Sequence, residues 1–315
     1  MSTDDLKNLI DIIFKTFEVR KDPEITIEAN PDDLILTKTK ELKTLGFNRL
    51  SIGIQSFNDE ILKYLNRNHN SEDSFKAIKN AEKAGFENIN LDLIFAIREN
   101  YIDVLKDDIE KFIKVNPQHI SMYSLTIEDK TVFGNWVKKG KINSVSPDTS
   151  AIEFEYIMET LERAGYQQYE VSNFSKPGFI SKHNSNYWKG VHYLGIGPSA
   201  HSFNGTSRQS NISNNSAYIK SIEKGTIPYV KEALSKADKI NDLLLTGLRT
   251  IWGADLDLIK KRFGVDLARY NKNYIQDLIE LDLATFNDGK IQLSKKGILI
   301  ADKIFSDLFF IDEND

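Results

Sequence analysis

Residues 49–56 read RLSIGIQS, a run in which polar and apolar side chains alternate. Successive side chains of a strand point to opposite faces, so the run predicts a strand with Leu50, Ile52 and Ile54 on one face. Its other face carries Arg49, Ser51, Gly53 and Gln55. Three further runs alternate in the same way and leave one polar face each: residues 24–30 (EITIEAN), 88–96 (NINLDLIFA) and 119–125 (HISMYSL).

Helical patterns lie between these predicted strands. The spacing of apolar residues predicts helices over residues 37–45, 59–66, 71–84 and 101–115. Strands that alternate with helices indicate parallel βα units and an α/β fold. A closed barrel fills its interior with branched apolar side chains, so a polar inner face favours an open or partial barrel around a polar ligand. The alternative is an antiparallel sheet with one solvated face.

The first helix has no strand before it. Residues 1–17 carry an apolar stripe that includes Leu6, Ile10 and Phe14 and needs a packing partner. We therefore expect a segment upstream of Met1 to be missing.

The chain after residue 147 predicts two further regions. Residues 148–210 begin with a helix ending at Gly165, continue with a strand over residues 166–174, and end in a loop rich in aromatic residues. Residues 211–315 predict a mostly helical, winged-helix-like module, and the acidic charge of the chain favours a structural role for it over DNA binding. Its predicted elements are helices 238–251, 255–263 and 271–281, a hairpin over residues 284–293 and a last helix over residues 295–308.

Composition restricts the classes of partner. The 315 residues carry a formal net charge of −5, which provides no global basic field for nucleic acid. No apolar run is long enough for a transmembrane helix, and the N-terminus lacks a signal-peptide pattern, so we expect a cytoplasmic protein. The sequence contains no cysteine, which excludes disulfides, thiolate zinc sites and cysteine-ligated iron–sulfur clusters in these 315 residues.

Polar side chains end the predicted strands. Glu28 and Gln55 stand at the ends of the first two strands, and Asp92 lies on the polar face of the third. Arg67 follows a short helix and could pair with a ligand carboxylate. Because these polar side chains are expected to converge at one mouth of the barrel, they predict a site for a small molecule. The alternatives are a cap or an ion pair with Arg49 for Glu28, and a solvated side chain for Arg67.

Two motifs follow in the second region. HNSNYW (residues 183–188) places His183 near Tyr187 and Trp188, which suits a flat metal-containing cofactor with His183 as axial ligand. A hydrogen-bonded structural histidine is the alternative, and His192 and His201 compete for the ligand role. GIGPSAH (residues 195–201) predicts a tight turn and not a dinucleotide site, since no βαβ unit surrounds it.

The ordered motifs resemble a known family. EITIEANPDDL, GFNRLSIGIQSFNDEILKYLNRNH, NINLDLIF, PQHISMYSLTIE, YEVSNF, HNSNYW and YLGIGPSAHS are similar to radical S-adenosylmethionine (radical SAM) proteins related to oxygen-independent coproporphyrinogen III oxidase. Arg67, His69 and HNSNYW favour the HemW-type haem chaperones within that group. The resemblance runs from about residue 2 to residue 308.

This resemblance implies a partial (β/α)6 radical-SAM-type barrel, with its first βα units missing, followed by the helical module. It divides the chain into the barrel (1–147), an extension with the haem-motif loop (148–210) and the C-terminal domain (211–315). It implies that Glu28, Gln55, Arg67 and Asp92 contact S-adenosylmethionine. It also implies that His183 binds haem iron within the HNxxYW motif, beside Tyr187 and Trp188.

The sequence departs from the family at two places. The CxxxCxxC segment, which ligates a [4Fe–4S] cluster in the family, and the GGGTP-type turn are absent, so we expect neither the cluster nor radical chemistry in these residues. Ala96-Ile97-Arg98 replaces the usual Gly-Leu-Pro, which predicts a reshaped loop.

The leading hypothesis is a HemW-type haem chaperone, truncated at its N-terminus, with haem and haem-accepting proteins as partners. A homodimer is left open, no catalytic residue is assigned, and enzymatic activity is not decided by the sequence. The alternatives are a coproporphyrinogen oxidase-type radical enzyme when intact, and a non-functional fragment.

Overall fold

The computed structural model describes residues 1–129, 131–140 and 142–311. The chain divides into two compact units, Met1–Ser181 and Lys182–Asp315. The three-part division expected from the sequence stays a prediction.

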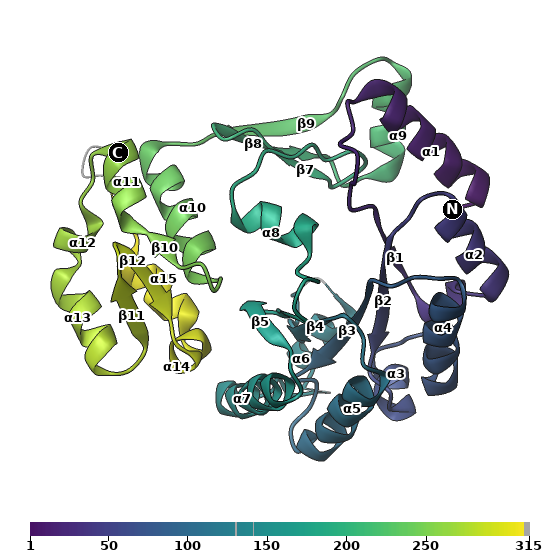
Figure 1. Cartoon of the computed structure of the whole chain (residues 1–315), viewed down its shortest axis with the longest axis horizontal. Helices are drawn as coiled ribbons and strands as arrows, with labels where there is room; N and C mark the ends of the chain where they lie inside the picture. Colours follow the sequence, from purple (N-terminus) through teal and green to yellow (C-terminus); the bar gives the residue numbers. More distant parts are fainter. Residues whose placement is uncertain (130, 141, 312–315) are drawn as a thin grey trace. The chain divides into compact units, whose positions relative to one another are not determined.

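An open six-stranded sheet forms the centre of the first unit (Figure 1). Its order is β1-β2-β3-β4-β6-β5, and its strands are β1 (Thr26–Ala29), β2 (Arg49–Gln55), β3 (Ile89–Phe95), β4 (His119–Ser124), β5 (Gln167–Glu170) and β6 (Asn173–Ser175). Strands β1 to β4 pair in parallel, so the α/β prediction is confirmed and the antiparallel alternative is wrong for them. Because β1 and β5 lie at the two edges, the sheet does not close into a barrel.

The single strand predicted over residues 166–174 is wrong. Strands β5 and β6 form an antiparallel hairpin, and β6 pairs antiparallel with β4. The Gln168 side-chain amide donates a hydrogen bond of 3.0 Å to the Val171 carbonyl within this turn. Neither glycine nor proline marks the turn in YQQYEVSNF, which explains why the sequence pattern did not reveal it.

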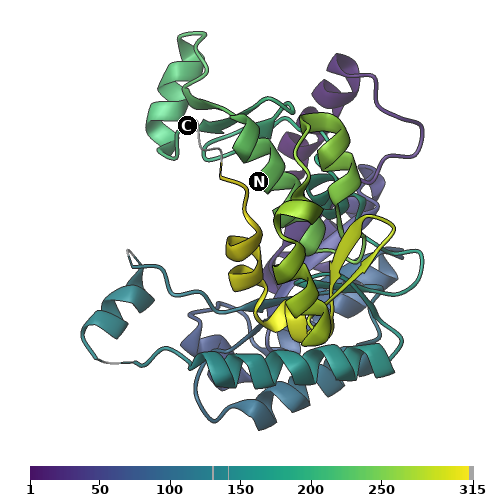
Figure 2. The same cartoon turned by 90° about the vertical axis from the view of Figure 1, so that its left-hand side faces the viewer.

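The helices of the first unit are α1 (Thr3–Thr16), η1 (Pro31–Asp33), α2 (Leu36–Thr44), α3 (Asp59–Tyr64), α4 (Ser71–Lys83), α5 (Ile102–Val115), α6 (Val132–Lys138) and α7 (Pro147–Arg163). Most of them flank the sheet (Figure 1). The apolar face of the sheet packs beneath them, and Leu50, Ile52 and Leu91 have no exposed surface. Each such side chain contributes about 1.5–3 kcal/mol by its burial. Helix α6 projects away from the sheet (Figure 2).

The second unit begins with a helix where a loop was expected. Residues 183–188 lie in α8 (Lys182–Trp188), so the loop prediction is wrong. A three-stranded antiparallel sheet follows, with β7 (His201–Phe203), β8 (Ser207–Asn211) and β9 (Tyr229–Ala233), and α9 (Asn215–Glu223) precedes β9. Helix α9 agrees with the expectation of a helical chain after residue 211, whereas strand β9 was not predicted. All its residues are exposed, so no buried face produced a pattern.

The end of the chain has the predicted order of helices and a hairpin. Its elements are α10 (Lys236–Leu248), β10 (Ala254–Asp255), α11 (Leu256–Phe263), α12 (Leu267–Tyr270), α13 (Lys272–Glu280), β11 (Ala284–Asn287), β12 (Lys290–Leu293), α14 (Lys295–Leu299) and α15 (Ala301–Leu308). Asp288 and Gly289 both have positive φ, as a two-residue hairpin turn requires. β10 joins this hairpin, which gives the winged-helix-like arrangement. The predicted last helix is interrupted at Ile300.

In the described part of the chain, no helix combines the length and the apolar character that crossing a membrane requires.

Candidate functional site

A cavity of about 320 Å³ is lined by residues of β1, β2 and β3. Glu28, Gln55 and Asp92 line it from these three strands, and Arg67 lines it from the loop after α3. All four residues singled out in the sequence therefore meet at one place. Glu28 lies near the end of β1, Gln55 at the end of β2 and Asp92 in the middle of β3, and these three strands are neighbours in the sheet. Their roles as ligand contacts stay predictions.

Gln55 adopts an unusual backbone conformation at the end of β2. Its φ is 68°, in the left-handed region that few residues other than glycine adopt, and the pairing of β2 with β3 shifts just before it. A Cβ atom on Gly53 would lie 2.8 Å from the Gln55 side-chain nitrogen, so glycine at that position leaves room for this amide. This backbone conformation places the buried side-chain amide of Gln55 in the wall of the cavity.

Asp92 is the titratable centre of this cavity. Its Oδ1 accepts a hydrogen bond of 2.7 Å from the Asn90 side chain, which also donates to Ser51 Oγ at 2.7 Å. Burial raises the pKa of Asp92 to about 6, although hydrogen bonds from Asn90 and Ser121 oppose that rise. Asp92 therefore changes its charge close to neutral pH.

A buried histidine holds the Asn90 amide. His119 has no exposed surface, and burial, with a smaller effect of the Arg49 charge, keeps its pKa well below the usual value. A neutral imidazole has one donor and one acceptor nitrogen. Since His119 Nδ1 contacts the Asn90 oxygen at 2.5 Å, it donates there, and Nε2 accepts from the Tyr169 hydroxyl at 2.8 Å. A chain of hydrogen bonds thus links Tyr169 to Asp92.

The alternative ion pair between Glu28 and Arg49 is not formed among the described residues. Arg49 is 4% exposed, and its Nε has no hydrogen-bond partner there. The Glu28 carboxylate is exposed and lines the cavity. Glu28 is therefore available to a ligand. The Arg49 charge lies near Asp92 and His119 and acts to lower the pKa of each side chain.

His69 fixes the loop that carries Arg67. Its ring is 4% exposed, and its Nε2 donates a hydrogen bond of 3.1 Å to the Ile54 carbonyl at the end of β2. Arg67 itself is half-buried and lines the cavity, which weighs against the solvated alternative.

Ala96-Ile97-Arg98 stands where the family has Gly-Leu-Pro, yet the backbone at Ala96 has a conformation typical of glycine. Ala96 has a φ of 54°, and its N–H donates a hydrogen bond of 2.7 Å to the Glu153 carboxylate on α7. Arg98 stacks on the Tyr64 and Tyr101 rings at 5.1 Å and 4.8 Å. The loop is thus held by contacts to α7 and to two aromatic rings, while Ala96 occupies a strained conformation.

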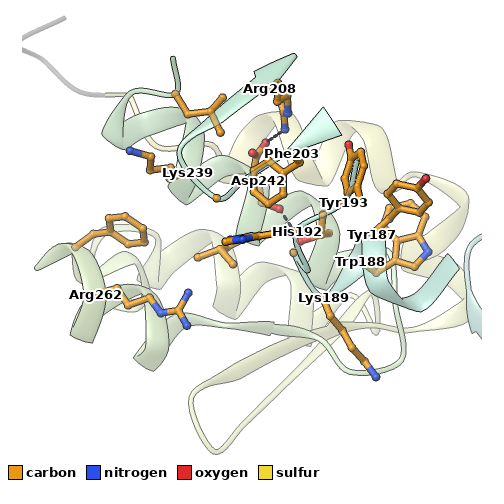
Figure 3. A pocket seen from close by; sticks show the side chains of 16 residues that line it. Tyr187, Trp188, Lys189, His192, Tyr193, Phe203, Arg208, Lys239, Asp242 and Arg262 are labelled. Atoms are coloured by element: carbon orange, nitrogen blue, oxygen red, sulfur yellow. Dashed lines mark hydrogen bonds and ion pairs between the residues drawn. The ribbon is translucent and has the colours of Figure 1, made fainter. Parts of the chain in front are cut away.

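The HNSNYW residues lie on α8 beside a second cavity of about 330 Å³ (Figure 3). Tyr187 and Trp188 line this cavity, whereas His183 does not; the His183 ring packs edge-on against Tyr187 at 5.0 Å between centroids. His192 also lines the cavity, and His201 does not. The structure therefore brings one of the competing histidines, and two residues of the motif, to the same hollow.

Sequence reasoning missed the opposite wall of this second cavity. Arg208 comes from β8, Asp242 from α10, and Arg262 with Phe263 from the end of α11. No motif or spacing connects these residues, because only the fold of the second unit brings them near Trp188.

Comparisons with known proteins agree with this architecture. The Radical SAM superfamily model matches residues 2–112, and the HemN C-terminal domain model matches residues 234–300. The chain is 34% identical to the Heme chaperone HemW of Bacillus subtilis (strain 168) over 307 residues, covering 97% of this chain and 81% of that relative.

Two further relatives extend the comparison. The chain is 34% identical to the Heme chaperone HemW of Lactococcus lactis subsp. lactis (strain IL1403), covering 100% of this chain and 83% of that relative. The solved structure of coproporphyrinogen III oxidase (HemN) from Escherichia coli superposes with a TM-score of 0.82 at 22% identity, covering 98% of this chain and 75% of that one. The structural likeness shows the shared fold, and the sequence identity shows the family. The chain belongs to the HemW family of the radical SAM superfamily.

Proposed function

We propose that this chain is a haem-handling protein of the HemW type that binds S-adenosylmethionine in its first unit and haem in its second. The observation that carries the proposal is the meeting of Glu28, Gln55, Arg67 and Asp92 around one polar cavity. Gln55 is buried, and Arg67 and Asp92 are half-buried. Polar groups in such places require partners, and a polar ligand supplies them.

Each of the four side chains suits a part of S-adenosylmethionine. The Glu28 and Asp92 carboxylates accept hydrogen bonds from its amino group and ribose hydroxyls, and the Arg67 guanidinium pairs with its carboxylate. The Gln55 amide both donates and accepts. The donor set therefore fits this ligand.

The residues present do not fit an iron–sulfur cluster. None of the 315 residues is a cysteine, and the described residues contain no group of three or more histidine, aspartate or glutamate side chains able to hold a metal ion. Clusters of this kind require thiolate ligands. We therefore assign no radical step to these residues.

Haem binding is proposed for the α8 segment. The two HemW relatives carry the name heme chaperone, and this chain has the HNSNYW sequence that the HNxxYW motif requires. In this proposal His183 supplies an imidazole to the iron, while Tyr187 and Trp188 provide aromatic surface for the macrocycle. Proteins that accept haem are the proposed partners; the homodimer and the cytoplasmic location stay predictions.

Haem titration tests the proposal. We expect the purified full chain to shift the Soret band of haem and to saturate at one haem per chain. His183→Ala should weaken the affinity by at least about tenfold, as expected for loss of an iron ligand. His201→Ala is the matched control, because His201 is exposed and lies outside the cavity of Figure 3, and it should behave as wild type. A titration without saturation would contradict haem binding.

A further inference from the structure

The second cavity carries an excess of positive charge although the whole chain is negative. Its lining includes the cationic side chains of Lys189, Arg208, Lys239 and Arg262, and Asp242 is its one carboxylate. Asp242 already pairs with Arg208 at 2.5 Å (Figure 3). Lys189 lies over the Trp252 ring at 4.6 Å.

Arg262 is one of three cations of the lining, with Lys189 and Lys239, that have no anionic partner among the described residues. Within the described residues it forms no ion pair or side-chain hydrogen bond, and its guanidinium end points toward the side of the cavity where His192 lies (Figure 3). A guanidinium beside an apolar wall is a strong partner for a carboxylate, because it can donate two parallel hydrogen bonds. The cavity therefore suits an anionic ligand.

The walls of the cavity are aromatic. Tyr187, Trp188, Tyr193, Phe203 and Phe263 line it, and the Tyr193 ring packs against Tyr187 at 4.6 Å between centroids. Aromatic walls favour a flat apolar ligand, whose faces they cover by stacking or edge contacts. Flat apolar surface and carboxylates on one molecule describe a tetrapyrrole with acidic side chains.

His192 adds a nitrogen ligand for a metal at the centre of such a molecule. Its ring lies edge-on to Phe203 at 6.1 Å between centroids, and neither ring nitrogen has a hydrogen-bond partner among the described residues. A Cβ atom on Gly205 would lie 2.7 Å from His192 Nε2, so the glycine provides the space in which the imidazole stands. Imidazole nitrogen is a common ligand of haem iron.

We infer that this cavity is a haem site in which Arg262 pairs with a haem carboxylate and His192 binds the iron from the cavity side. The inference rests on the haem binding proposed above, and it adds a contact from α11 and one from the loop after α8 to those of α8. A cavity of about 330 Å³ with an exposed His192 takes one edge of the macrocycle, and the remainder stays at the surface.

Two probes separate the two contacts. Haem has both carboxylates and iron, whereas metal-free protoporphyrin has the carboxylates alone. Arg262→Gln should weaken both ligands by about fivefold, the size expected for a partly exposed ion pair. His192→Ala should weaken haem by about tenfold or more and alter its Soret maximum, while it leaves the affinity for metal-free protoporphyrin unchanged.

Matched controls exclude general effects of charge or of histidine removal. Arg269→Gln removes an exposed arginine of α12 outside the cavity, and His201→Ala removes an exposed histidine of β7; both should bind as wild type. Circular dichroism and thermal unfolding of each variant verify that it is folded.

The outcomes distinguish this inference from the proposed function. If His183→Ala weakens haem binding while Arg262→Gln or His192→Ala binds as wild type, the inference is overturned and haem binding by the chain stands. If wild type shows no saturable haem binding, the proposed function and the inference fail together. Weakening of both probes by Arg262→Gln, and of haem alone by His192→Ala, supports the inference.

Discussion

At the scale of single residues, Asp92 links the chemistry of the first cavity to pH. It is held by Asn90, which the neutral His119 orients, and burial raises its pKa to about 6. A ligand that needs the ionised carboxylate must therefore compete with a proton just below neutral pH.

The first prediction concerns this competition. The affinity for S-adenosylmethionine should fall about tenfold between pH 7 and pH 5, because Asp92 becomes protonated over this range. The ionised carboxylate accepts hydrogen bonds from the ligand with both oxygens, whereas the protonated form carries an O–H that needs an acceptor of its own. Asp92→Asn should bind more weakly at pH 7 and show no step near pH 6. Isothermal titration calorimetry from pH 5 to pH 8 measures both. Asp32→Asn, which changes an exposed aspartate outside the cavity, should keep the wild-type profile; a step in the Asp92 variant would assign the titration to another group.

The second prediction concerns stability. The pKa of Asp92 in the folded chain is about 6, above its ordinary value of 3.8, so folding favours the protonated form. The contribution of this group to stability is full below pH 3.8 and is lost as the pH rises through 6. Asp92→Asn should therefore gain stability over wild type at pH 8, by at most about 3 kcal/mol, and the gain should shrink toward pH 4.

Urea unfolding of wild type and Asp92→Asn at pH 4, 6 and 8 measures this gain. The same difference in free energy of unfolding at all three pH values would contradict a raised pKa.

At the scale of elements, strand ends and helix contacts determine where the functional side chains lie. Alternation in residues 49–56 predicted β2 within one residue and placed Gln55 on its polar face, and Gln55 lines the first cavity. Alternation could not reveal the left-handed backbone at Gln55, because that conformation depends on the shifted pairing with β3. Helix α8 was also missed, since HNSNYW has no apolar period to mark it.

The loop after β3 provides the third prediction. Ala96 has a φ of 54°, which costs an L-residue about 1–2 kcal/mol relative to glycine, whereas glycine loses about 0.5–1 kcal/mol more conformational entropy on folding. Ala96→Gly should therefore stabilise the chain by about 0.5–1 kcal/mol. Thermal unfolding compares it with Ala84→Gly, a change at a helix end with negative φ that should destabilise. Destabilisation by Ala96→Gly would mean that the backbone there is not strained.

The fourth prediction concerns the attachment of α5 to β2. Asp108 on α5 is buried, and it accepts hydrogen bonds from the Ser56 hydroxyl at 2.5 Å and from the Phe57 N–H at 2.7 Å. Asp108→Ala leaves both donors buried without an acceptor and should cost about 2–4 kcal/mol in urea unfolding.

Its neighbour provides the control. Asp107 pairs with Lys111 at the surface, so Asp107→Ala should cost less than about 1 kcal/mol. Equal losses for the two variants would show that Asp108 does not anchor the helix.

At the scale of the whole molecule, each of the two units has its own cavity, and the sequence revealed one more fully than the other. Three of the residues predicted for the first cavity, Glu28, Gln55 and Asp92, lie on neighbouring parallel strands, and the alternation of side chains along a strand is a general rule that predicts their shared polar face. The second cavity joins α8 to residues of β8, α10 and α11, for which no such rule exists. Tyr187 and Trp188 were predictable from a motif, whereas Arg208 and Arg262 required the fold.

The central claim is that Glu28, Gln55, Arg67 and Asp92 together form the binding site for S-adenosylmethionine. Calorimetric titration of S-adenosylmethionine into the full chain and its Arg67→Gln variant tests it, with Arg20→Gln, an exposed arginine away from the cavity, as control. We predict binding at one molecule per chain, weakened at least about tenfold by Arg67→Gln because a charged, bidentate contact is lost, and unchanged in the control. Absence of saturable binding to the wild-type chain, or equal affinity in the Arg67 variant, would contradict the claim.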